Sequence, residues 1–323
     1  MKLATLKDGT RDGQLAVVSR DLSVAHLATG ICPTLQKALD DWPFFAPQLQ
    51  DLYETLNAGK GARHAFAFEA ARCMAPLPRA YLFVNAQAYP SHAERLRHAT
   101  TPEPYLHFLG GDELLGPCDD ITRARDAVDV DFGASLAVIT DDVPMGADEK
   151  RASEAIRLLV LVNQVSLNDS ARESVARDLS VANTPAAAFS PVAVTPDELG
   201  DAWDQQRVHL PVFVHREGKR VGAVHAAQDM AFGFSALIAR AAHVRRLRAG
   251  AIVGAGIVSN HDASRGYACI GEKRAFENET QGCAQTPYLV EGETVRIEMF
   301  DAQGPKQGQS IFGAIAQKLV VHT

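Results

Sequence analysis

The chain has 323 residues, of which 46% are hydrophobic and 22% charged, a composition typical of a globular protein with a large core. Its formal net charge of -7 argues against a nucleic-acid or anionic-membrane partner, because both need a basic surface. No apolar run reaches the roughly 18 residues that a membrane-spanning helix needs. The five cysteines are odd in number and widely spaced, and we find no signal peptide, so we expect a reduced, cytoplasmic protein.

The first 60 residues predict a small α+β unit. Residues 2–6 and 15–19 resemble strands that flank an Asp- and Gly-rich turn, as in a hairpin. A helical pattern begins at Thr34, and a second one follows Pro47 and stops at residues 57–59. Two closely spaced prolines at 76 and 78 favour a domain boundary. We therefore predict an N-terminal domain over residues 1–75 and a larger domain over residues 76–323.

The larger domain reads as a series of short strands with few helices. An amphipathic helix is expected within residues 148–166, running into a buried strand, and another helix over 232–242. A polar segment at 169–186 suits an active-site lid. Strands are expected at residues 80–84, 131–140, 191–194, 208–214, 251–258, 267–270, 294–300 and 311–321. The pattern favours an α+β, β-rich fold with a rolled or sandwiched sheet.

Two motifs in this region have ordinary explanations. Gly254-Ala255-Gly256 lacks the third glycine and the following helix of a dinucleotide-binding loop, so we interpret it as a strand whose glycines allow close packing. The aspartates between residues 119 and 142 fall mostly in turns or at strand ends, and we interpret them as a solvated acidic surface.

The strand at residues 131–140 carries the most informative sequence, Asp-Phe-Gly-Ala-Ser followed by an apolar run. It resembles the signature strand of the fumarylacetoacetate hydrolase (FAH) family, in which Asp-Phe-Glu-Ala-Glu precedes such a run. The resemblance extends from about Leu77 to the C-terminus and weakly into the first 60 residues. It implies an FAH-type β-roll or sandwich in the larger domain and, commonly, a homodimer.

The family binds a divalent metal through four carboxylates, and the matching positions here are all neutral. They are Asn85, Gly133, Ser135 and Gln164. Hard divalent cations need charged oxygen ligands, so we expect no metal at this site and no other cofactor. All four positions are instead expected to line a substrate pocket, in which Asn85, Ser135 and Gln164 would supply neutral donors. Three further pocket positions have also departed from the family pattern: Phe108, Thr184 and Ile257.

Two residues of the family's proton-transfer machinery are retained. His92 matches the general base, and Glu272, which we place at the end of a strand at 267–270, matches the carboxylate that orients it. Neither residue stands out from its type alone, since a lone histidine or strand-end carboxylate is more often structural. A carboxylate partner selects one imidazole tautomer and suits general base catalysis near neutral pH.

Three functions remain open. The first is a metal-independent enzyme that uses His92 and Glu272 on a small activated carbonyl or oxo-acid compound, by isomerisation, tautomerisation, elimination or cyclisation. The second is an inactive pseudo-hydrolase with a binding or scaffold role. The third is a conventional metal-dependent hydrolase of a 1,3-diketone, if the metal-ligand positions are misplaced. The partners expected are a small-molecule substrate and a second copy of the chain.

Overall fold

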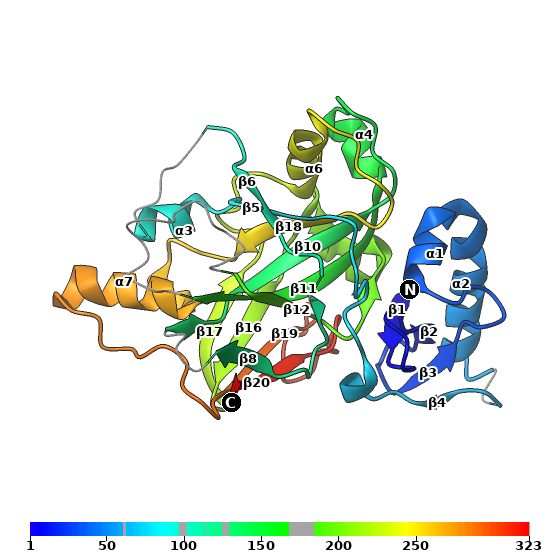
Figure 1. Ribbon diagram of the computed structural model, residues 1–323, viewed down its shortest axis with the longest axis horizontal. Coiled ribbons are helices and arrows are strands. Elements are labelled where there is room, and N and C mark those ends of the chain that lie inside the picture. The colour runs from blue at the N-terminus through cyan, green and yellow to red at the C-terminus, as the bar shows by residue number, and fades with distance from the viewer. Residues whose placement is uncertain (61–62, 97–101, 113, 125–128, 168–183, 323) are drawn as a thin grey trace.

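Strands dominate the computed structural model, which describes residues 1–60, 63–96, 102–112, 114–124, 129–167 and 184–322 (Figure 1). Within these ranges the strands form a 13-stranded sheet, a five-stranded sheet and a two-stranded ribbon. Short helices lie around them. This arrangement confirms the β-rich α+β class that the sequence predicts. None of the described helices is long and apolar enough to cross a bilayer.

The N-terminal residues form four strands and two helices, drawn in blue on one side of Figure 1. The elements are β1 (Lys2–Leu6), β2 (Gln14–Val18), β3 (Val24–Leu27), β4 (Phe66–Ala67), α1 (Leu35–Asp40) and α2 (Trp42–Asn57). Thr34 caps α1, its hydroxyl accepting a hydrogen bond from the backbone N–H of Lys37. The predicted start of the second helix after Pro47 is wrong. Helix α2 already begins at Trp42 and contains Pro47 in its second turn, where a proline removes only one backbone hydrogen bond.

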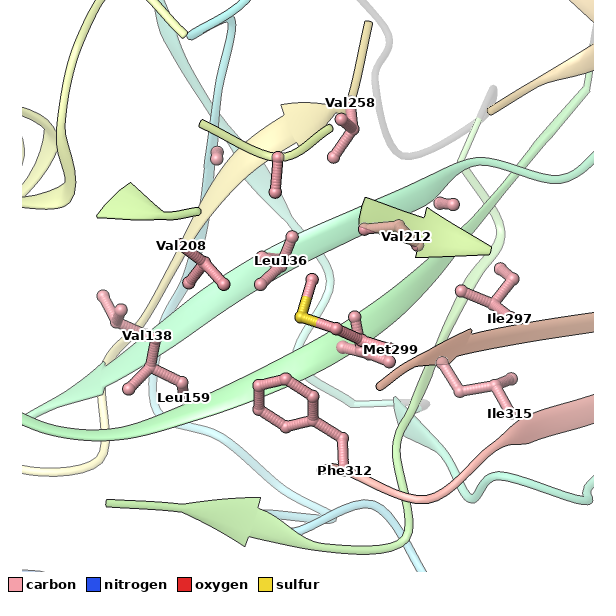
Figure 2. Close-up of a cluster of buried hydrophobic side chains, with 14 of the residues drawn as sticks. Leu136, Val138, Leu159, Val208, Val212, Val258, Ile297, Met299, Phe312 and Ile315 are labelled. Atoms are coloured by element: carbon pink, nitrogen blue, oxygen red, sulfur yellow. The ribbon is translucent and has the colours of Figure 1, made fainter. Parts of the chain in front are cut away.

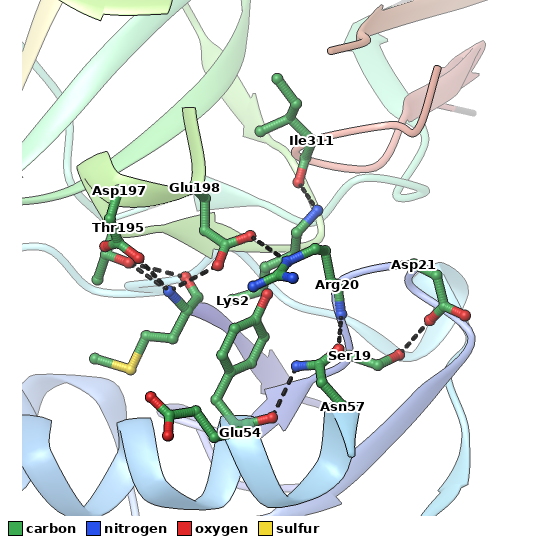
Figure 3. Close-up of polar contacts among 12 residues, drawn as sticks. Lys2, Ser19, Arg20, Asp21, Glu54, Asn57, Thr195, Asp197, Glu198 and Ile311 are labelled. Atoms are coloured by element: carbon green, nitrogen blue, oxygen red, sulfur yellow. Dashed lines mark hydrogen bonds and ion pairs between the residues drawn. The ribbon is translucent and has the colours of Figure 1, made fainter. Parts of the chain in front are cut away.

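These N-terminal strands extend the sheet of the larger domain. β1 pairs antiparallel with β13 (Ala193–Val194), with Lys2 opposite Val194. The Lys2 ammonium group donates a hydrogen bond to the backbone oxygen of Ile311 at 2.6 Å (Figure 3). It donates a second hydrogen bond to the backbone oxygen of Ser310. Burial lowers the pKa of Lys2 to about 8. Main-chain pairing therefore joins the start of the chain to β13, and the buried Lys2 cation joins it to a segment near the end of the chain.

The rest of the large sheet comes from residues 83–257. Its strands are β5 (Phe83–Ala86), β6 (Leu106–Leu109), β7 (Leu114–Leu115), β9 (Val130–Asp131), β10 (Ala134–Thr140), β11 (Ile156–Leu167), β12 (Ala186–Phe189), β13 and β18 (Ile252–Ile257). Along its main path, the order is β4-β3-β2-β1-β13-β11-β10-β18-β5-β6. β5 and β18 run parallel, so the segments that follow them leave the sheet at the same edge.

The five-stranded sheet has the order β17-β16-β19-β20-β8. Its strands are β8 (Ile121–Ala124), β16 (Pro211–Arg216), β17 (Lys219–His225), β19 (Thr294–Met299) and β20 (Ile315–His322). The ribbon consists of β14 (Trp203–Asp204) and β15 (Arg207–Val208). The remaining α-helices are α3 (Pro90–Arg95), α4 (Glu149–Glu154), α6 (Phe234–Ala242) and α7 (Ile270–Gln281), and 3-10 turns span Ala70–Arg72, Pro196–Ala202 and Ala263–Arg265.

The central pair of strands, β10 and β11, is buried on both faces. Leu136 and Val138 on β10 face one core, where they meet Ile297, Met299 and Phe312 near the five-stranded sheet (Figure 2). The alternate residues of β10, Ala137 and Ile139, belong to a second core that also contains residues of α1 and α2. Burial on both sides explains why these strands are almost continuously apolar in sequence.

Three further predicted elements are wrong. The helix expected within residues 148–166 ends at Glu154, because the following run fits a strand that is buried on both faces. The strand expected at 267–270 gives way to α7, so that Glu272 lies in the first turn of a helix. The strand expected at 208–214 is divided between β15 and β16, and β17 was missed. Most of the lid predicted at 169–186 lies outside the described residues, and its last residue begins β12.

Phe312 offers a test of the first core, because its side chain is fully buried. Replacing Phe312 with Ala should reduce the free energy of unfolding by about 3–5 kcal/mol, through lost burial and the cavity left behind. Phe44→Ala is the matched control, since Phe44 is 61% exposed and should contribute within about 0.5 kcal/mol. Urea denaturation measures both. Equal losses in the two variants would contradict the assignment of Phe312 to the core.

Candidate active site

His92 and Glu272 meet at the contact between helices α3 and α7. His92 lies in α3, which begins at Pro90 just after β5, and Glu272 lies in the first turn of α7. Their side chains are joined by a 2.8 Å hydrogen bond from Nδ1 to Oε1. The carboxylate is 1% exposed and the imidazole 15% exposed. An N–H at Nδ1 that donates to the carboxylate leaves Nε2 of the neutral ring as an acceptor.

The surroundings of Glu272 keep its carboxylate charged. Burial raises the pKa of Glu272, but the imidazole of His92, the hydroxyl of Ser259 and the Arg95 guanidinium together bring it below its ordinary value. Arg95 Nη1 lies 3.5 Å from Oε2, while Nη2 donates to the backbone oxygens of Asn260 and His261. The Oε2 atom itself has no hydrogen-bond partner among the described residues.

Asp131 holds the first turn of α7 in place. Its Oδ1 accepts a 2.7 Å hydrogen bond from the backbone N–H of Ile270, and its Oδ2 accepts one of the same length from Gly271. Helix N-termini have unsatisfied N–H groups, and here a carboxylate from a distant strand pairs with two of them. Burial raises the pKa of Asp131 to about 7, against the opposing effect of these N–H donors. The aspartate of the signature strand thus fixes the turn that carries Glu272.

Cys269 completes the group as the residue that precedes α7. One donor atom each from Cys269, His92 and Glu272 lies within 4.8 Å of the other two. Burial raises the pKa of the Cys269 thiol well above its ordinary value, although the backbone N–H groups of Glu272 and Gly271 oppose the change. The thiol is therefore neutral at physiological pH in the described structure.

Two of the four positions matched to metal ligands pair with each other. The amide of Asn85 donates to Oε1 of Gln164 at 3.0 Å, and the amide of Gln164 donates to Oδ1 of Asn85 at 2.8 Å. Oδ1 of Asn85 also accepts from the backbone N–H of Gly256, and the Asn85 amide lies 3.5 Å from Nε2 of His107. Burial lowers the pKa of His107. Asn85 and Gln164 therefore carry no charge, and most of their hydrogen-bonding capacity is used by each other and by their immediate neighbours.

The other two positions are Gly133 and Ser135. The space beside Gly133 is filled by a neighbouring side chain, and the hydroxyl of Ser135 is already hydrogen bonded. A Cβ atom at Gly133 would lie 2.7 Å from Cδ1 of Ile257, so the isoleucine fills the space that a side chain at 133 would need. The Ser135 hydroxyl is fully buried and donates to the backbone oxygen of Gly256 at 2.7 Å. With no carboxylate among the four and their polar atoms already paired, these residues do not fit a hard divalent cation.

The same two segments, residues 257–259 and 131–133, contact both the His92–Glu272 pair and the neutral group, which consists of Asn85, Gly133, Ser135 and Gln164. Ile257 contacts the Gly133 position, and two residues later Ser259 lies beside Glu272. Similarly, Asp131 anchors α7 and Gly133 follows two residues after it. The ends of β18 and β9 therefore place the two groups next to each other; that His92, Glu272, Asn85, Ser135 and Gln164 form one catalytic site stays a prediction.

Phe108 and Thr184 are not brought into these groups by any described contact. In β6, Phe108 pairs with Val84 and neighbouring His107 pairs with Asn85, so Phe108 lies on the opposite face from Asn85. Its ring is 54% exposed, with the Arg245 guanidinium 5.2 Å from the ring centre. Thr184 is half-buried two residues before β12, directly after residues that the structure does not describe.

The interpretation of the aspartates between residues 119 and 142 as a solvated surface is wrong for Asp131, which is buried against α7. Sequence reasoning also missed Arg95, Cys269 and His107, which lie near the site. Two of these residues lie in segments that the sequence already singles out. Asp131 begins the signature strand, and Cys269 lies three residues before Glu272. Alternation in a strand could have indicated His107, next to the singled-out Phe108. The role of Asp131 depends on a contact across 139 residues, which no local pattern reveals.

Two surface hollows, of about 380 and 410 Å³, lie away from these groups. Both are lined by Asp40 and Tyr81, and they border α1 and the segment that precedes β5. Their charged side chains include the exposed ion pair of Arg79 with Asp12. Such exposed pairs contribute little and indicate no chemistry, so we take the His92–Glu272 region as the candidate active site.

Comparison with known families accounts for almost the whole chain. Residues 1–79 match the model described as fumarylacetoacetase N-terminal domain 2, and residues 82–320 match the fumarylacetoacetate (FAA) hydrolase C-terminal model. The chain belongs to the fumarylacetoacetate hydrolase family. The FAH resemblance drawn from the signature strand is confirmed, while the domain boundary after residue 75 stays a prediction.

Solved structures of FAH-family proteins share this fold. Fumarylacetoacetate hydrolase from Exiguobacterium antarcticum has a TM-score of 0.66 at 17% identity. Maleylpyruvate hydrolase from Sphingobium sp. SYK-6, in complex with manganese(II) ion and pyruvate, has 0.65 at 15%. 5-Carboxymethyl-2-hydroxymuconate delta-isomerase from Mycobacterium smegmatis has 0.63 at 16%. Each comparison covers 100% of both chains. No curated protein matches the chain.

The four neutral positions and Ile257 predict how metal binding could be introduced. A variant with Asn85→Asp, Gly133→Glu, Ser135→Glu, Gln164→Asp and Ile257→Thr should bind Mn²⁺, because it supplies carboxylates and the space that a side chain at position 133 needs. The same four acidic changes with Ile257 retained should bind more weakly, since Cδ1 of Ile257 obstructs position 133. Calorimetric titration of the folded variants measures this. Equal affinity of the two would contradict the role given to Ile257.

Asp131 gives the stability a pH dependence of predictable sign. Its pKa rises from 3.8 to about 7 on folding, so the folded state holds the proton over a wider range. This contribution to stability is present below pH ~4 and declines as pH rises through 7. Wild-type unfolding free energy minus that of Asp131→Asn should therefore be larger at pH 5 than at pH 8. A difference that stays constant would contradict the assigned pKa.

Proposed function

We propose that this protein transfers protons on a small activated carbonyl or oxo-acid compound without a divalent metal, using His92 as general base. The observation that carries the proposal is the 2.8 Å hydrogen bond between Nδ1 of His92 and the buried carboxylate of Glu272. It fixes the tautomer that exposes a basic Nε2. No described residue hydrogen bonds with that nitrogen, which leaves it available to a substrate.

The reaction follows from this geometry. Nε2 accepts a proton from the carbon next to a carbonyl group, and the electron pair moves toward the carbonyl oxygen. Glu272 stabilises the imidazolium cation formed in this step, as carboxylate partners of catalytic histidines do. Return of the proton to a different atom completes a tautomerisation or isomerisation, while loss or attack of a neighbouring group gives an elimination or cyclisation.

Proton transfer suits the neutral group better than hydrolysis of a carbon–carbon bond. The family's hydrolytic reaction uses its metal to stabilise enolate charge, an effect worth several kcal/mol. Here Asn85 and Gln164 offer only amide groups, and these are already engaged with each other. Any oxyanion stabilisation from them requires that the pair open. An activated substrate, whose own substituents delocalise the enolate charge formed by proton abstraction, fits this site best.

The names of the structural relatives include both isomerases and hydrolases, so they do not select one reaction. Their printed names include a hydroxymuconate isomerase as well as fumarylacetoacetate and maleylpyruvate hydrolases. The manganese(II) ion and pyruvate belong to the maleylpyruvate hydrolase complex. Because the metal-ligand positions of this chain carry no carboxylate, we favour an isomerase-type or lyase-type reaction over metal-dependent hydrolysis of a 1,3-diketone.

A binding or scaffold role without catalysis is the second candidate. It is favoured by one observation, which is that Ile257 fills the space beside Gly133 while Asn85 and Gln164 satisfy each other. A site that is packed and hydrogen-bonded in this way has no evident need for a ligand. The two candidates differ in what they require of His92, since a scaffold does not need its basicity.

Hydrogen–deuterium exchange tests this directly. The protein, treated with EDTA, is incubated in D₂O with a panel of 2-oxo acids and 1,3-diketones, and proton NMR follows exchange at the carbon next to the carbonyl group. Wild type should accelerate exchange of at least one compound. His92→Ala should slow that exchange by ~10²–10⁴-fold, because a positioned general base contributes that much.

The control is His243→Ala, since His243 is exposed and lies directly after the end of α6. This variant should exchange as fast as wild type, and circular dichroism should show all three proteins folded. Exchange that survives in His92→Ala would remove His92 from the mechanism. No exchange with any compound of the panel would favour the scaffold role.

A further inference from the structure

We propose that Cys269, His92 and Glu272 form a binding site for a soft divalent transition metal, with Zn²⁺ as the foremost candidate. The site is distinct from the four neutral positions, because it uses other residues and a different donor set. Where the proposed function holds, the bound metal is an inhibitor, since it takes up both partners of the proton-transfer pair.

The three donor atoms are already close together. They come from α3 and from the start of α7, and all lie within 4.8 Å of one another. Ligands of a tetrahedral zinc ion at 2.0–2.3 Å would be separated by about 3.3–3.8 Å. Small side-chain rotations therefore bring the sulfur, an imidazole nitrogen and a carboxylate oxygen to bonding distance, and water occupies the fourth position.

A buried carboxylate oxygen without a hydrogen bond lies at this place. Oε2 of Glu272 is buried and makes no hydrogen bond with any described residue. The contact that it does make is a long ion pair, since Nη1 of Arg95 lies 3.5 Å away, while Nη2 of the same group donates to two backbone oxygens. A buried carboxylate oxygen that lacks a hydrogen bond is costly, so a metal ion bound at Oε2 would satisfy it more fully than the distant guanidinium does.

The donor set selects a soft or borderline metal. Thiolate and imidazole suit zinc and cobalt, whereas magnesium and calcium prefer oxygen atoms alone. Burial raises the pKa of the Cys269 thiol, while the backbone N–H groups of Glu272 and Gly271 oppose the rise, so the thiolate forms when the metal binds. Charges also balance, since the Cys269 thiolate and the Glu272 carboxylate together neutralise the dication.

Metal binding and the His92–Glu272 hydrogen bond exclude each other. The thiol proton of Cys269 passes to solvent when the sulfur binds the metal. The proton on Nδ1 of His92 moves to Nε2, so that Nδ1 can bind the ion. Nε2 then carries a proton and can no longer accept one from a substrate, and the oxidation state of the metal does not change.

Cobalt(II) reports on such a site without any substrate. The full chain, freed of metal by chelator, is titrated with Co²⁺, and absorption is recorded in the near-ultraviolet and visible ranges. One equivalent should give a sulfur-to-cobalt charge-transfer band together with the intense visible bands of a tetrahedral ion. Added Zn²⁺ should abolish both, because it displaces cobalt.

Two variants and one control assign the ligands. Cys269→Ser should lose the near-ultraviolet band and weaken Co²⁺ binding by about tenfold or more, and Glu272→Gln should keep the band but weaken binding comparably. Cys283→Ser is the control, since Cys283 is exposed just beyond the other end of α7. It should bind like wild type. Thermal unfolding checks that each variant is folded.

The proposal is overturned if folded wild type gives no charge-transfer band, or if the band survives in Cys269→Ser. Should that variant fail to fold, an unchanged Co²⁺ affinity in folded Glu272→Gln overturns it equally. Turnover is not used, so a failed titration leaves the proposed proton transfer standing. Conversely, an inactive protein that binds cobalt would retain the metal site while losing the function.

Discussion

The candidate site depends on the contact between the carboxylate of Asp131 and the N-terminal turn of α7. Both carboxylate oxygens accept backbone N–H groups at 2.7 Å, and the turn that they hold carries Glu272. Without this contact, the helix that is seen projecting from the sheets in Figure 1 has no fixed starting point. The aspartate of the signature strand is retained in this chain while both signature glutamates are gone, and the contact gives a physical reason for that difference.

Loss of the metal-ligand carboxylates and repacking of their surroundings form one structural change. Glycine at 133 leaves a space, and Ile257 fills it. Asparagine and glutamine at 85 and 164 can each donate and accept, so they pair in both directions where two carboxylates would repel. The result is a buried polar pair of low energy without an ion. Nothing in this repacking disturbs His92, whose partner is held from the other side by α7.

Much of the fold could be predicted because the apolar pattern is strong. Strands such as residues 2–6 and 131–140 are bounded by Asp, Gly or Pro, and the family resemblance gave the site residues their relative placement. Errors arose where burial on both faces removed the periodicity, as in β11, which looked like the end of a helix. They also arose where the residue that caps a helix is distant in sequence. Helix α7, which carries Glu272, is capped by Asp131, and the small residues before the helix contain no capping signal.

Within the site, the sequence indicated which residues lie there, but not which hydrogen bonds and packing contacts they make. The pairing of Asn85 with Gln164 and the filling of the Gly133 space by Ile257 depend on distances between strands that lie far apart in sequence. The unpartnered oxygen of Glu272 is likewise a property of geometry alone. Composition and motif spacing contain no information on which donors are already in use, and that information decides whether a cation can be accommodated.

The separation of His92 from Glu272 along the chain has a consequence for biogenesis. The two residues are 180 positions apart, and the second is delivered only after most strands of both sheets have been synthesised. A nascent chain that ends before α7 therefore contains the histidine but not its carboxylate partner. Proteins dominated by such distant pairings fold slowly, because loop closure precedes the contacts that reward it. The reactive pair is thus assembled late, and an incompletely folded chain lacks it.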